Sequence, residues 1–172
     1  TDKFAINEYN KSDAKLVIID DNLDYVIKIP IVEKYDYCEK EVFIYEQAKR
    51  FDLAHFFAES MKLGEYSGQP IYLMEKMDVN NFEIERKFYE GYQLYCEQHY
   101  IDYDEKEARY YYTDGCIDDY TVVEGLFAEC SWEVMDKLIL FLTDFEVNDL
   151  FENNFGLDKD GEVMIIDDSG YR

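Results

Sequence analysis

The feature that most constrains the fold is a short turn late in the sequence, Asp158-Lys-Asp-Gly161. It separates two short runs of apolar and β-branched residues, 155–157 and 163–166. Asp and Gly favour tight reversals of the chain, so the three pieces together predict a β-hairpin. Apolar residues recur at three- and four-residue spacing over 132–145, which predicts a helix just upstream. The order is therefore helix, loop and hairpin.

Three side chains beside this hairpin carry oxygen atoms that suit a hard cation. Asp149 and Asn154 lie in the loop before the hairpin, and Asp167 directly follows its second strand. Because the hairpin returns the chain toward that loop, two carboxylates and one amide can converge on one point. Mg²⁺ is usually held by one or two carboxylates together with substrate phosphates. The alternative is an acidic hairpin whose Asp and Asn residues only form turns.

The pattern Asp149-Leu-x-x-x-Asn154, followed by Ile165-Ile-Asp167, resembles the catalytic loop and metal-binding Asp of the protein-kinase-like phosphotransferases. The resemblance implies that Asp149 orients the attacking hydroxyl, while Asn154 and Asp167 hold the metal. Two positions depart from the family pattern. Val147 stands where the family has His, and Asp167-Asp-Ser replaces Asp-Phe-Gly, with Asp168-Ser-Gly170 as a shifted register.

A second resemblance lies near the N-terminus. Residues 15–20 and 25–30 predict a hairpin, and Val26-Ile-Lys28 resembles the kinase strand whose Lys touches nucleotide phosphates. The helix predicted over 37–50 carries Glu41, which the resemblance pairs with Lys28, with Glu46 as the alternative. Taken without the resemblance, Lys28 is a lysine on the exposed face of an edge strand and Glu41 is a solvated acid.

Residues 58–63 and 71–76 predict a second hairpin, turning through 64–70. Its last strand resembles the strand and hinge that contact adenine in kinases, which makes Glu75 and Met77 candidate nucleotide-contacting residues. Asn80 and Glu83 then have the spacing of a helix capping box. The tyrosine-rich stretch 101–120 has no clear period, and helical spacing returns from Thr121 onward.

The predicted fold class is α+β, with a small antiparallel N-terminal sheet and one helix, then a helical portion carrying the catalytic-loop hairpin. The 172 residues amount to one domain, in which we expect an N-terminal lobe over 1–78 and a helical lobe over 79–172. No signal peptide or membrane-spanning run is present, so the expected location is cytoplasmic. The four Cys form no Cys-x-x-Cys pair and only two His could join them, so no zinc site or disulfide framework is predicted.

The charge of the chain limits its partners. Forty Asp and Glu against 17 Lys and Arg give a formal charge of −23, which repels nucleic acid and anionic membranes. Such a surface keeps a protein soluble, and it could also occupy the basic site of a partner. Direct nucleic-acid and membrane binding are therefore not expected.

Three functions follow. The first is a minimal phosphotransferase that uses ATP and Mg²⁺, with Lys28 on the phosphates, Glu41 positioning it and Asp149 orienting the acceptor. The second is a nucleotide-binding pseudokinase, because no Gly-x-Gly-x-x-Gly precedes Lys28 and five residues follow Asp167, too few for an activation segment. The third is a non-enzymatic acidic protein that binds or inhibits a basic partner.

Overall fold

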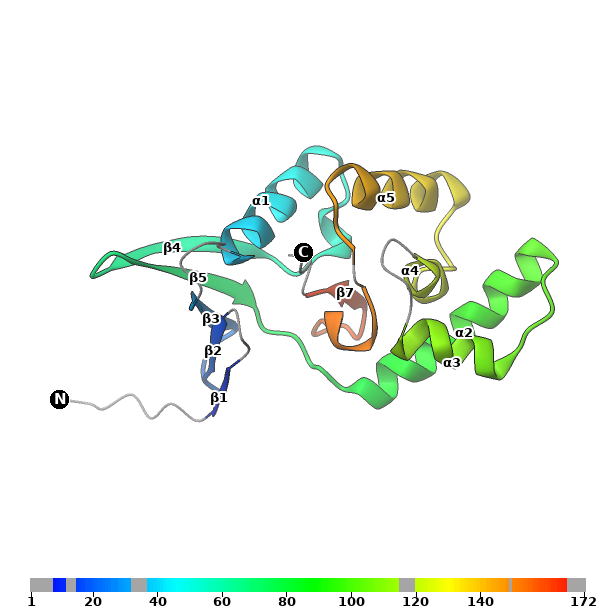
Figure 1. Ribbon diagram of the computed structural model, residues 1–172, viewed down its shortest axis with the longest axis horizontal. Coiled ribbons are helices and arrows are strands. Elements are labelled where there is room, and N and C mark those ends of the chain that lie inside the picture. The colour runs from blue at the N-terminus through cyan, green and yellow to red at the C-terminus, as the bar shows by residue number, and fades with distance from the viewer. Residues whose placement is uncertain (1–7, 12–14, 32–36, 115–119, 149, 167–172) are drawn as a thin grey trace. The chain divides into compact units, whose positions relative to one another are not determined.

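The chain divides into two compact units, Thr1–Met77 and Asp78–Arg172, and each is described by itself. The computed structural model describes residues 8–11, 15–31, 37–114, 120–148 and 150–166 (Figure 1). Within these residues, no helix has the length and apolar character needed to cross a bilayer. The fold class is α+β: an antiparallel sheet with a helix comes first, followed by a helical portion with a hairpin.

The N-terminal unit is built on an antiparallel sheet with the strand order β1-β2-β3-β5-β4 (Figure 1). Both predicted hairpins, β2-β3 and β4-β5, are present and lie side by side, which makes β3 a central strand. The helix predicted over 37–50 is also present. The elements are β1 (Glu8–Lys11), β2 (Lys15–Ile19), β3 (Tyr25–Pro30), α1 (Tyr37–Arg50), the 3₁₀ turn η1 (Ala54–Phe56), β4 (Ser60–Tyr66) and β5 (Gln69–Glu75).

Two strands differ from the sequence prediction. Strand β1 falls in what reads as a polar lead, because Glu8–Lys11 lacks the apolar alternation that marks a strand. Strands β4 and β5 are longer than predicted: the chain turns at Ser67 and Gly68, both with positive φ, and not over 64–70. Gly64 lies inside β4, where the register shifts by a bulge. A glycine that reads as a turn thus marks an irregular strand.

One face of this sheet is buried and α1 packs on it. Val26, Lys28 and Pro30 alternate inward along β3, and the register places Lys15 opposite Pro30 on the same face. Helix α1 buries Cys38, Glu41, Ile44 and Ala48 at three- and four-residue spacing and contacts β3 and β4. A charged residue therefore lies on the buried face of both the sheet and the helix.

The C-terminal unit begins with a long helix and ends with the predicted hairpin. Its elements are α2 (Asn81–His99), α3 (Glu105–Thr113), α4 (Thr121–Leu126), α5 (Trp132–Asp144), the 3₁₀ turn η2 (Glu152–Asn154), β6 (Phe155–Leu157) and β7 (Val163–Ile165). The turn of the hairpin forms as its sequence predicts. Asp158 Oδ1 accepts hydrogen bonds from the backbone N–H of Asp160 and Glu162, both at 2.8 Å, and Gly161 has a φ of 80°.

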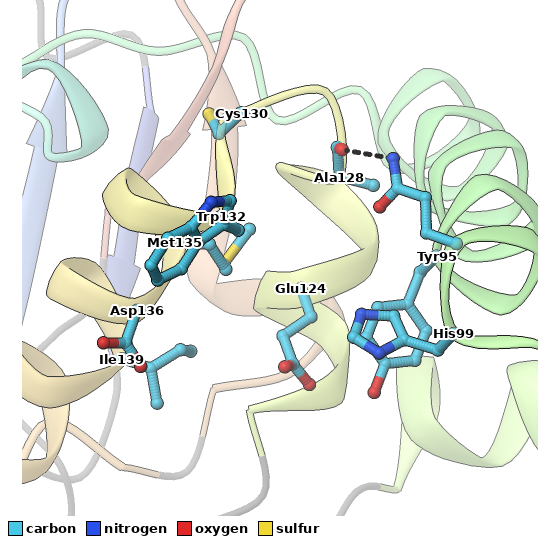
Figure 2. Close-up of a pocket in the computed structure, with 10 residues that line it drawn as sticks. Tyr95, His99, Glu124, Ala128, Cys130, Trp132, Met135, Asp136 and Ile139 are labelled. Atoms are coloured by element: carbon cyan, nitrogen blue, oxygen red, sulfur yellow. Dashed lines mark hydrogen bonds between the residues drawn. The ribbon is translucent and has the colours of Figure 1, made fainter.

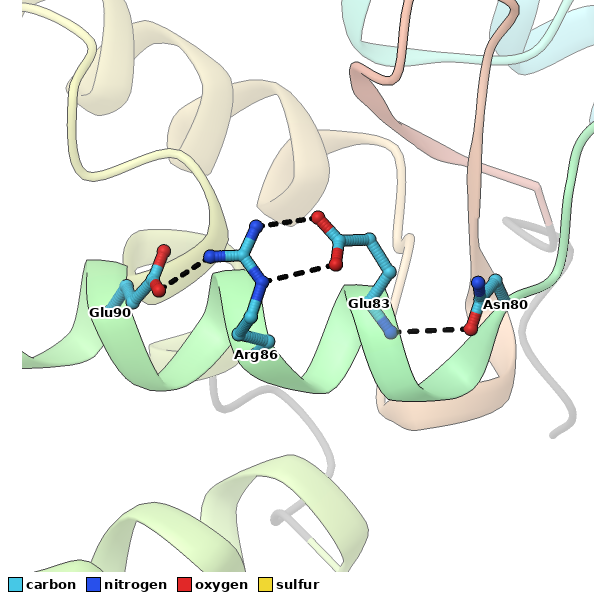
Figure 3. A network of polar contacts seen from close by, with 4 residues as sticks. All are labelled: Asn80, Glu83, Arg86 and Glu90. Atoms are coloured by element: carbon cyan, nitrogen blue, oxygen red, sulfur yellow. Dashed lines mark hydrogen bonds and ion pairs between the residues drawn. The ribbon is translucent and has the colours of Figure 1, made fainter.

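The capping box predicted at the start of α2 is only half formed (Figure 3). Asn80 Oδ1 accepts from the backbone N–H of Glu83 at 3.3 Å, as expected of an N-cap. The Glu83 carboxylate does not reach back to Asn80 and accepts two hydrogen bonds from Arg86. Arg86 also donates to Glu90, so its guanidinium outcompetes the backbone for the carboxylate.

Helices α3, α4 and α5 refine the second half of the prediction. Helix α3 lies inside the stretch without a clear period and is capped by Asp104, whose Oδ1 accepts from the N–H groups of Lys106 and Glu107. The helical region after Thr121 is two helices, because the chain breaks before Ser131, which caps α5. The polar N-cap residues Asp104 and Ser131 thus mark the first residues of α3 and α5. Residues of these types are also common in turns, so they do not identify a helix start by themselves.

Helices α2 and α4 cross where two glycines meet. A Cβ on Gly91 would lie 1.9 Å from the carbonyl oxygen of Gly125, and a Cβ on Gly125 would lie 2.7 Å from the Phe88 ring. Phe88, the ring next to Gly125, also stacks on Tyr92 of its own helix and on Tyr112 of α3. The two glycines therefore allow α4 to pack closely against α2 beside this aromatic cluster.

Candidate functional site

The predicted pair of Lys28 and Glu41 is present in the N-terminal unit. Lys28 lies on the central strand β3 with 4% of its surface exposed, and its Nζ donates to Glu41 Oε2 at 2.7 Å. Glu41 lies on α1 and is 2% exposed. The prediction of an ion pair is confirmed, and the alternatives of an edge-strand lysine and a solvated glutamate are wrong. The roles of the two residues in binding or catalysis stay predictions.

A second lysine joins this pair, and sequence reasoning missed it. Lys15 Nζ donates to the other carboxylate oxygen of Glu41, Oε1, and Lys15 is also 4% exposed. The signal that could have revealed it is strand register. In an antiparallel hairpin, a residue near the start of the first strand lies close to the end of the second, so Lys15 and Lys28 share a face.

The three buried side chains form a cluster of two ammonium groups and one carboxylate. We call Lys15, Glu41 and Lys28 the buried ion cluster. Burying ions carries a large desolvation penalty, and their mutual attraction offsets it only when the geometry is good. Well-packed apolar residues often match or exceed such a cluster in stability, so ion clusters are poor candidates for a purely stabilising role. Two ammonium groups converging on one carboxylate are also a suitable setting for an anion.

The other candidates in the N-terminal unit have different environments. Glu46, the alternative partner of Lys28, is exposed and pairs with Lys49 at 2.6 Å, so that alternative is wrong. Glu75 ends β5, and its N–H donates to Glu59 O at 2.8 Å. Met77 follows it, half-buried, and makes no main-chain hydrogen bond within the described residues. Of the two predicted hinge residues, Met77 is therefore the one whose backbone N–H and C=O make no main-chain hydrogen bond within the described residues.

In the C-terminal unit, Asn154 lies where η2 meets the hairpin. Its backbone carbonyl oxygen accepts a hydrogen bond from the backbone N–H of Ile166 at 2.8 Å. This bond lies just beyond the last strand pair, Phe155 with Ile165. Asn154 is thus paired with the residue that directly precedes Asp167. Asp149 and Asp167 themselves lie outside the described residues, so their predicted convergence with Asn154 stays a prediction.

The chain on either side of Asp149 is firmly held. Val147 is fully buried, its N–H donates to Leu142 O at 2.8 Å, and its carbonyl oxygen accepts from the Tyr120 hydroxyl at 3.0 Å. Asn148 and Leu150 are both 4% exposed. Val147, which stands where the resemblance expects His, is therefore a core residue whose backbone is hydrogen-bonded on both sides.

Other chemistries have little support in the residues that the structure describes. They contain no group of three or more His, Cys, Asp or Glu residues placed to hold a metal ion. Burial and the neighbouring Glu129 raise the pKa of the Cys130 thiol, so it stays protonated at neutral pH and is a poor nucleophile. The buried ion cluster and the hairpin with Asn154 remain the strongest candidates.

Comparison with known proteins adds no assignment. Neither protein-family models, nor curated proteins, nor solved structures give a match to this chain. The function must therefore be argued from the residues themselves.

Proposed function

We propose that the chain is a kinase-like protein that binds ATP with Mg²⁺, acting as a minimal phosphotransferase or as a nucleotide-binding pseudokinase. The observation that carries the proposal is the buried ion pair between Lys28 and Glu41. The kinase resemblance requires this pair on the third strand of a hairpin sheet and on the helix that follows it. Lys and Glu side chains are mostly exposed to solvent, so a buried pair at these two positions is not expected from an acidic composition alone.

Burial of the pair supports a functional role over a structural one. An exposed Lys–Glu pair is worth little and arises readily on a charged surface, whereas burial of three ionic groups is expensive and rare. Each of its two ammonium groups has three N–H donors, a chemistry that suits the phosphate oxygens of a nucleotide. In this role Glu41 fixes the position of the lysine ammonium groups, and Lys28 and Lys15 would hold phosphate oxygens.

Lys15 offers a reason why a glycine-rich loop can be missing. In kinases that loop covers the nucleotide phosphates with backbone from the first hairpin of the sheet. Here the first hairpin is β1-β2, and Lys15 is the first residue of β2. An ammonium group from that position supplies a charged donor where the family relies on backbone N–H groups.

The hairpin supports the metal half of the proposal. The backbone of Asn154 is hydrogen-bonded to that of Ile166, the residue before Asp167. This pairing is expected if the side chains of Asn154 and Asp167 hold one cation. Asn154 and Asp167 would hold Mg²⁺, which would supply positive charge to neutralise the phosphates. Asp149, whose neighbours Asn148 and Leu150 are buried, would orient the acceptor hydroxyl. Phosphoryl transfer depends mainly on such positioning, so Lys28 and Asp149 are the residues on which turnover rests.

Thermal unfolding with and without ATP and Mg²⁺ tests nucleotide binding. A ligand that binds only the folded protein raises its melting temperature as its concentration rises, so ATP with Mg²⁺ should stabilise the wild type. Lys28→Met should remove most of the shift, and Asp167→Asn should remove its metal-dependent part. Lys62→Met, which changes an exposed lysine on β4, is the matched control and should leave the shift intact. An equal shift in all four proteins would contradict the proposal.

Intact mass after incubation with ATP and Mg²⁺ separates an active kinase from a pseudokinase. We expect at most slow self-phosphorylation, abolished by Asp149→Ala and by Lys28→Ala. Phosphate incorporation of 80 Da that survives both substitutions would show that these residues do not carry the chemistry, with 80 Da being roughly the mass of the transferred PO₃ group. No incorporation, together with the thermal shift, would assign the pseudokinase.

A further inference from the structure

A pocket in the C-terminal unit has a character opposite to that of the buried ion cluster. It lies between the C-terminal end of α2, helix α4 and the first turns of α5 and has a volume of about 580 Å³ (Figure 2). This volume is within the range of pockets that hold small ligands or side chains. Its lining is aromatic, aliphatic and acidic, and no Lys or Arg is among the lining residues.

Helix α5 supplies one wall of the pocket. Trp132, Met135, Asp136 and Ile139 lie at three- and four-residue spacing, so they share one face of the helix. Sequence periodicity assigns Trp132 to the core, but 75% of its surface is exposed, and the core of α5 is formed by Leu138 and its neighbours. The indole of the chain's one tryptophan therefore borders solvent and the pocket.

The facing wall comes from α2, and an acid lies between the walls. Tyr95 and His99 are in ring contact, with centroids 4.4 Å apart, and they face α5 across Glu124 of α4 (Figure 2). Gln98 joins α2 to the chain after α4 by donating to Ala128 O at 3.5 Å. The carboxylate of Asp136 on the opposite wall has no hydrogen-bond or ion-pair partner within the described residues.

We propose that this pocket binds an arginine side chain presented by a basic segment of a partner protein. A guanidinium stacks on an indole or phenol face, and its planar fork donates to carboxylates. Trp132 and Tyr95 supply the faces, while Asp136 and Glu124 supply the acceptors. The aliphatic stem of the arginine fits the side chains of Met135 and Ile139.

Charge identifies the occupant as a cation and favours a peptide over a free metabolite. Residues 78–172 contain 25 Asp and Glu against 7 Lys and Arg, a formal charge of −18 that attracts a polycation. Inside the pocket, Glu124 and Asp136 disfavour an anionic ligand. The site shares no residue with the buried ion cluster, so it stands independently of the nucleotide proposal.

Trp132 makes the site directly measurable, because its fluorescence reports on the pocket alone. The probe is a tripeptide, acetyl-Gly-Arg-Gly amide, compared with its citrulline counterpart, which keeps the shape and loses the charge. We expect a saturable change in Trp132 emission with the arginine peptide and binding weaker by about tenfold with citrulline, since charge-assisted hydrogen bonds are roughly twice as strong as neutral ones. Equal responses to the two peptides would overturn the proposal, as would no saturable response.

Matched variants separate the pocket from the general acidity of the surface. The double change Glu124→Gln with Asp136→Asn should weaken arginine-peptide binding by about tenfold or more, because both acceptors of the guanidinium lose their charge. The double change Glu97→Gln with Glu133→Gln alters net charge equally at exposed positions outside the pocket and should change binding by less than about twofold. Equal weakening in both double variants would mean that diffuse surface charge, and not this pocket, holds the peptide.

Discussion

The two units of this chain use charge in opposite ways. Residues 1–77 contain 15 acids and 10 bases, a formal charge of −5, and bury three of these groups in one ion cluster. Residues 78–172 have a formal charge of −18, and their described ion pairs, such as Arg86 with Glu83 and Glu90, lie at the surface. Residues 1–77 also have exposed pairs, such as Lys49 with Glu46. The buried ion cluster is therefore what distinguishes the first unit from the second within the described residues.

This difference shows why a count of charges says little about function. An exposed pair is screened by water and salt, and its side chains lose conformational freedom when they associate, so the net gain is small. A buried pair depends on both partners, because removal of one leaves an ion without compensation in a low-dielectric setting. Burial, and not number, therefore identifies the ionic groups whose loss should affect stability most.

The largest effect should come from breaking the buried ion cluster. Glu41→Ala leaves two lysines without their shared carboxylate, and we expect it to lower the free energy of unfolding by about 3–5 kcal/mol. Urea unfolding followed by circular dichroism measures this loss. The control replaces all three members, Lys15→Met, Glu41→Met and Lys28→Met, and should recover most of the stability. A triple variant as unstable as Glu41→Ala would mean that the cluster is structural.

A somewhat smaller effect should come from the glycine crossing in the C-terminal unit. Gly91→Ala places a methyl group 1.9 Å from the carbonyl oxygen of Gly125, so α2 and α4 must separate. We expect a loss of about 2–3 kcal/mol, at the upper end of the range for overpacking. Unfolding followed by Trp132 fluorescence measures it. Gln93→Ala, at an exposed position of the same helix, should be nearly neutral, and equal losses in the two variants would contradict the packing argument.

Tyr112 provides a test of opposite sign in the same unit. Its hydroxyl is buried and has no hydrogen-bond partner within the described residues, and burial raises its pKa above the ordinary value. Tyr112→Phe removes an unsatisfied polar atom and keeps the ring stacked on Phe88. We therefore expect a change between zero and a gain of about 1 kcal/mol in unfolding free energy. A clear loss of unfolding free energy would show that the Tyr112 hydroxyl makes a stabilising hydrogen bond.

The smallest effect should come from the surface ion pairs. Arg86→Ala removes the guanidinium that bridges Glu83 and Glu90 on the exposed face of α2 (Figure 3). We expect no resolvable change in the urea midpoint at physiological salt, because solvent already screens these charges. A loss comparable with that of Glu41→Ala would erase the contrast between the two units.

The sequence predicts the elements better than it predicts their environments. Strands 15–20 and 25–30, helix 37–50 and the final hairpin follow from apolar periodicity and from turn residues such as Gly161, and the structure contains all of them. Strand β1 and helix α3 are absent from the prediction because their residues are polar and their starts depend on pairing or capping. Apolar periodicity contains no information about strand pairing or helix capping.

The candidate site shows the same division. Chain order identifies Glu41, but its burial beside Lys28 does not follow from periodicity, since both residues have the sequence pattern of surface charges. Lys15 could be found only from the strand register, which pairs it with Pro30. By its spacing, Trp132 belongs to the apolar stripe of α5. Only part of that stripe packs in the core, and Trp132 is exposed. Long-range contacts decide which charged residues are buried together and which aromatic residues line a pocket.

The proposed role of the buried ion cluster is to hold the phosphates of a nucleotide. Titration calorimetry on the wild type and on Lys28→Met, with ATP and with adenosine and always with Mg²⁺, tests this role. Lys28→Met should keep its fold, because Lys15 still pairs with Glu41.

Lys28→Met should weaken ATP binding by about tenfold or more and leave adenosine binding unchanged, because only ATP offers phosphate oxygens to the lysine. Lys62→Met serves as the control for charge. Equal weakening of both ligands, or no weakening of ATP binding, would contradict the assignment of Lys28 to the phosphates.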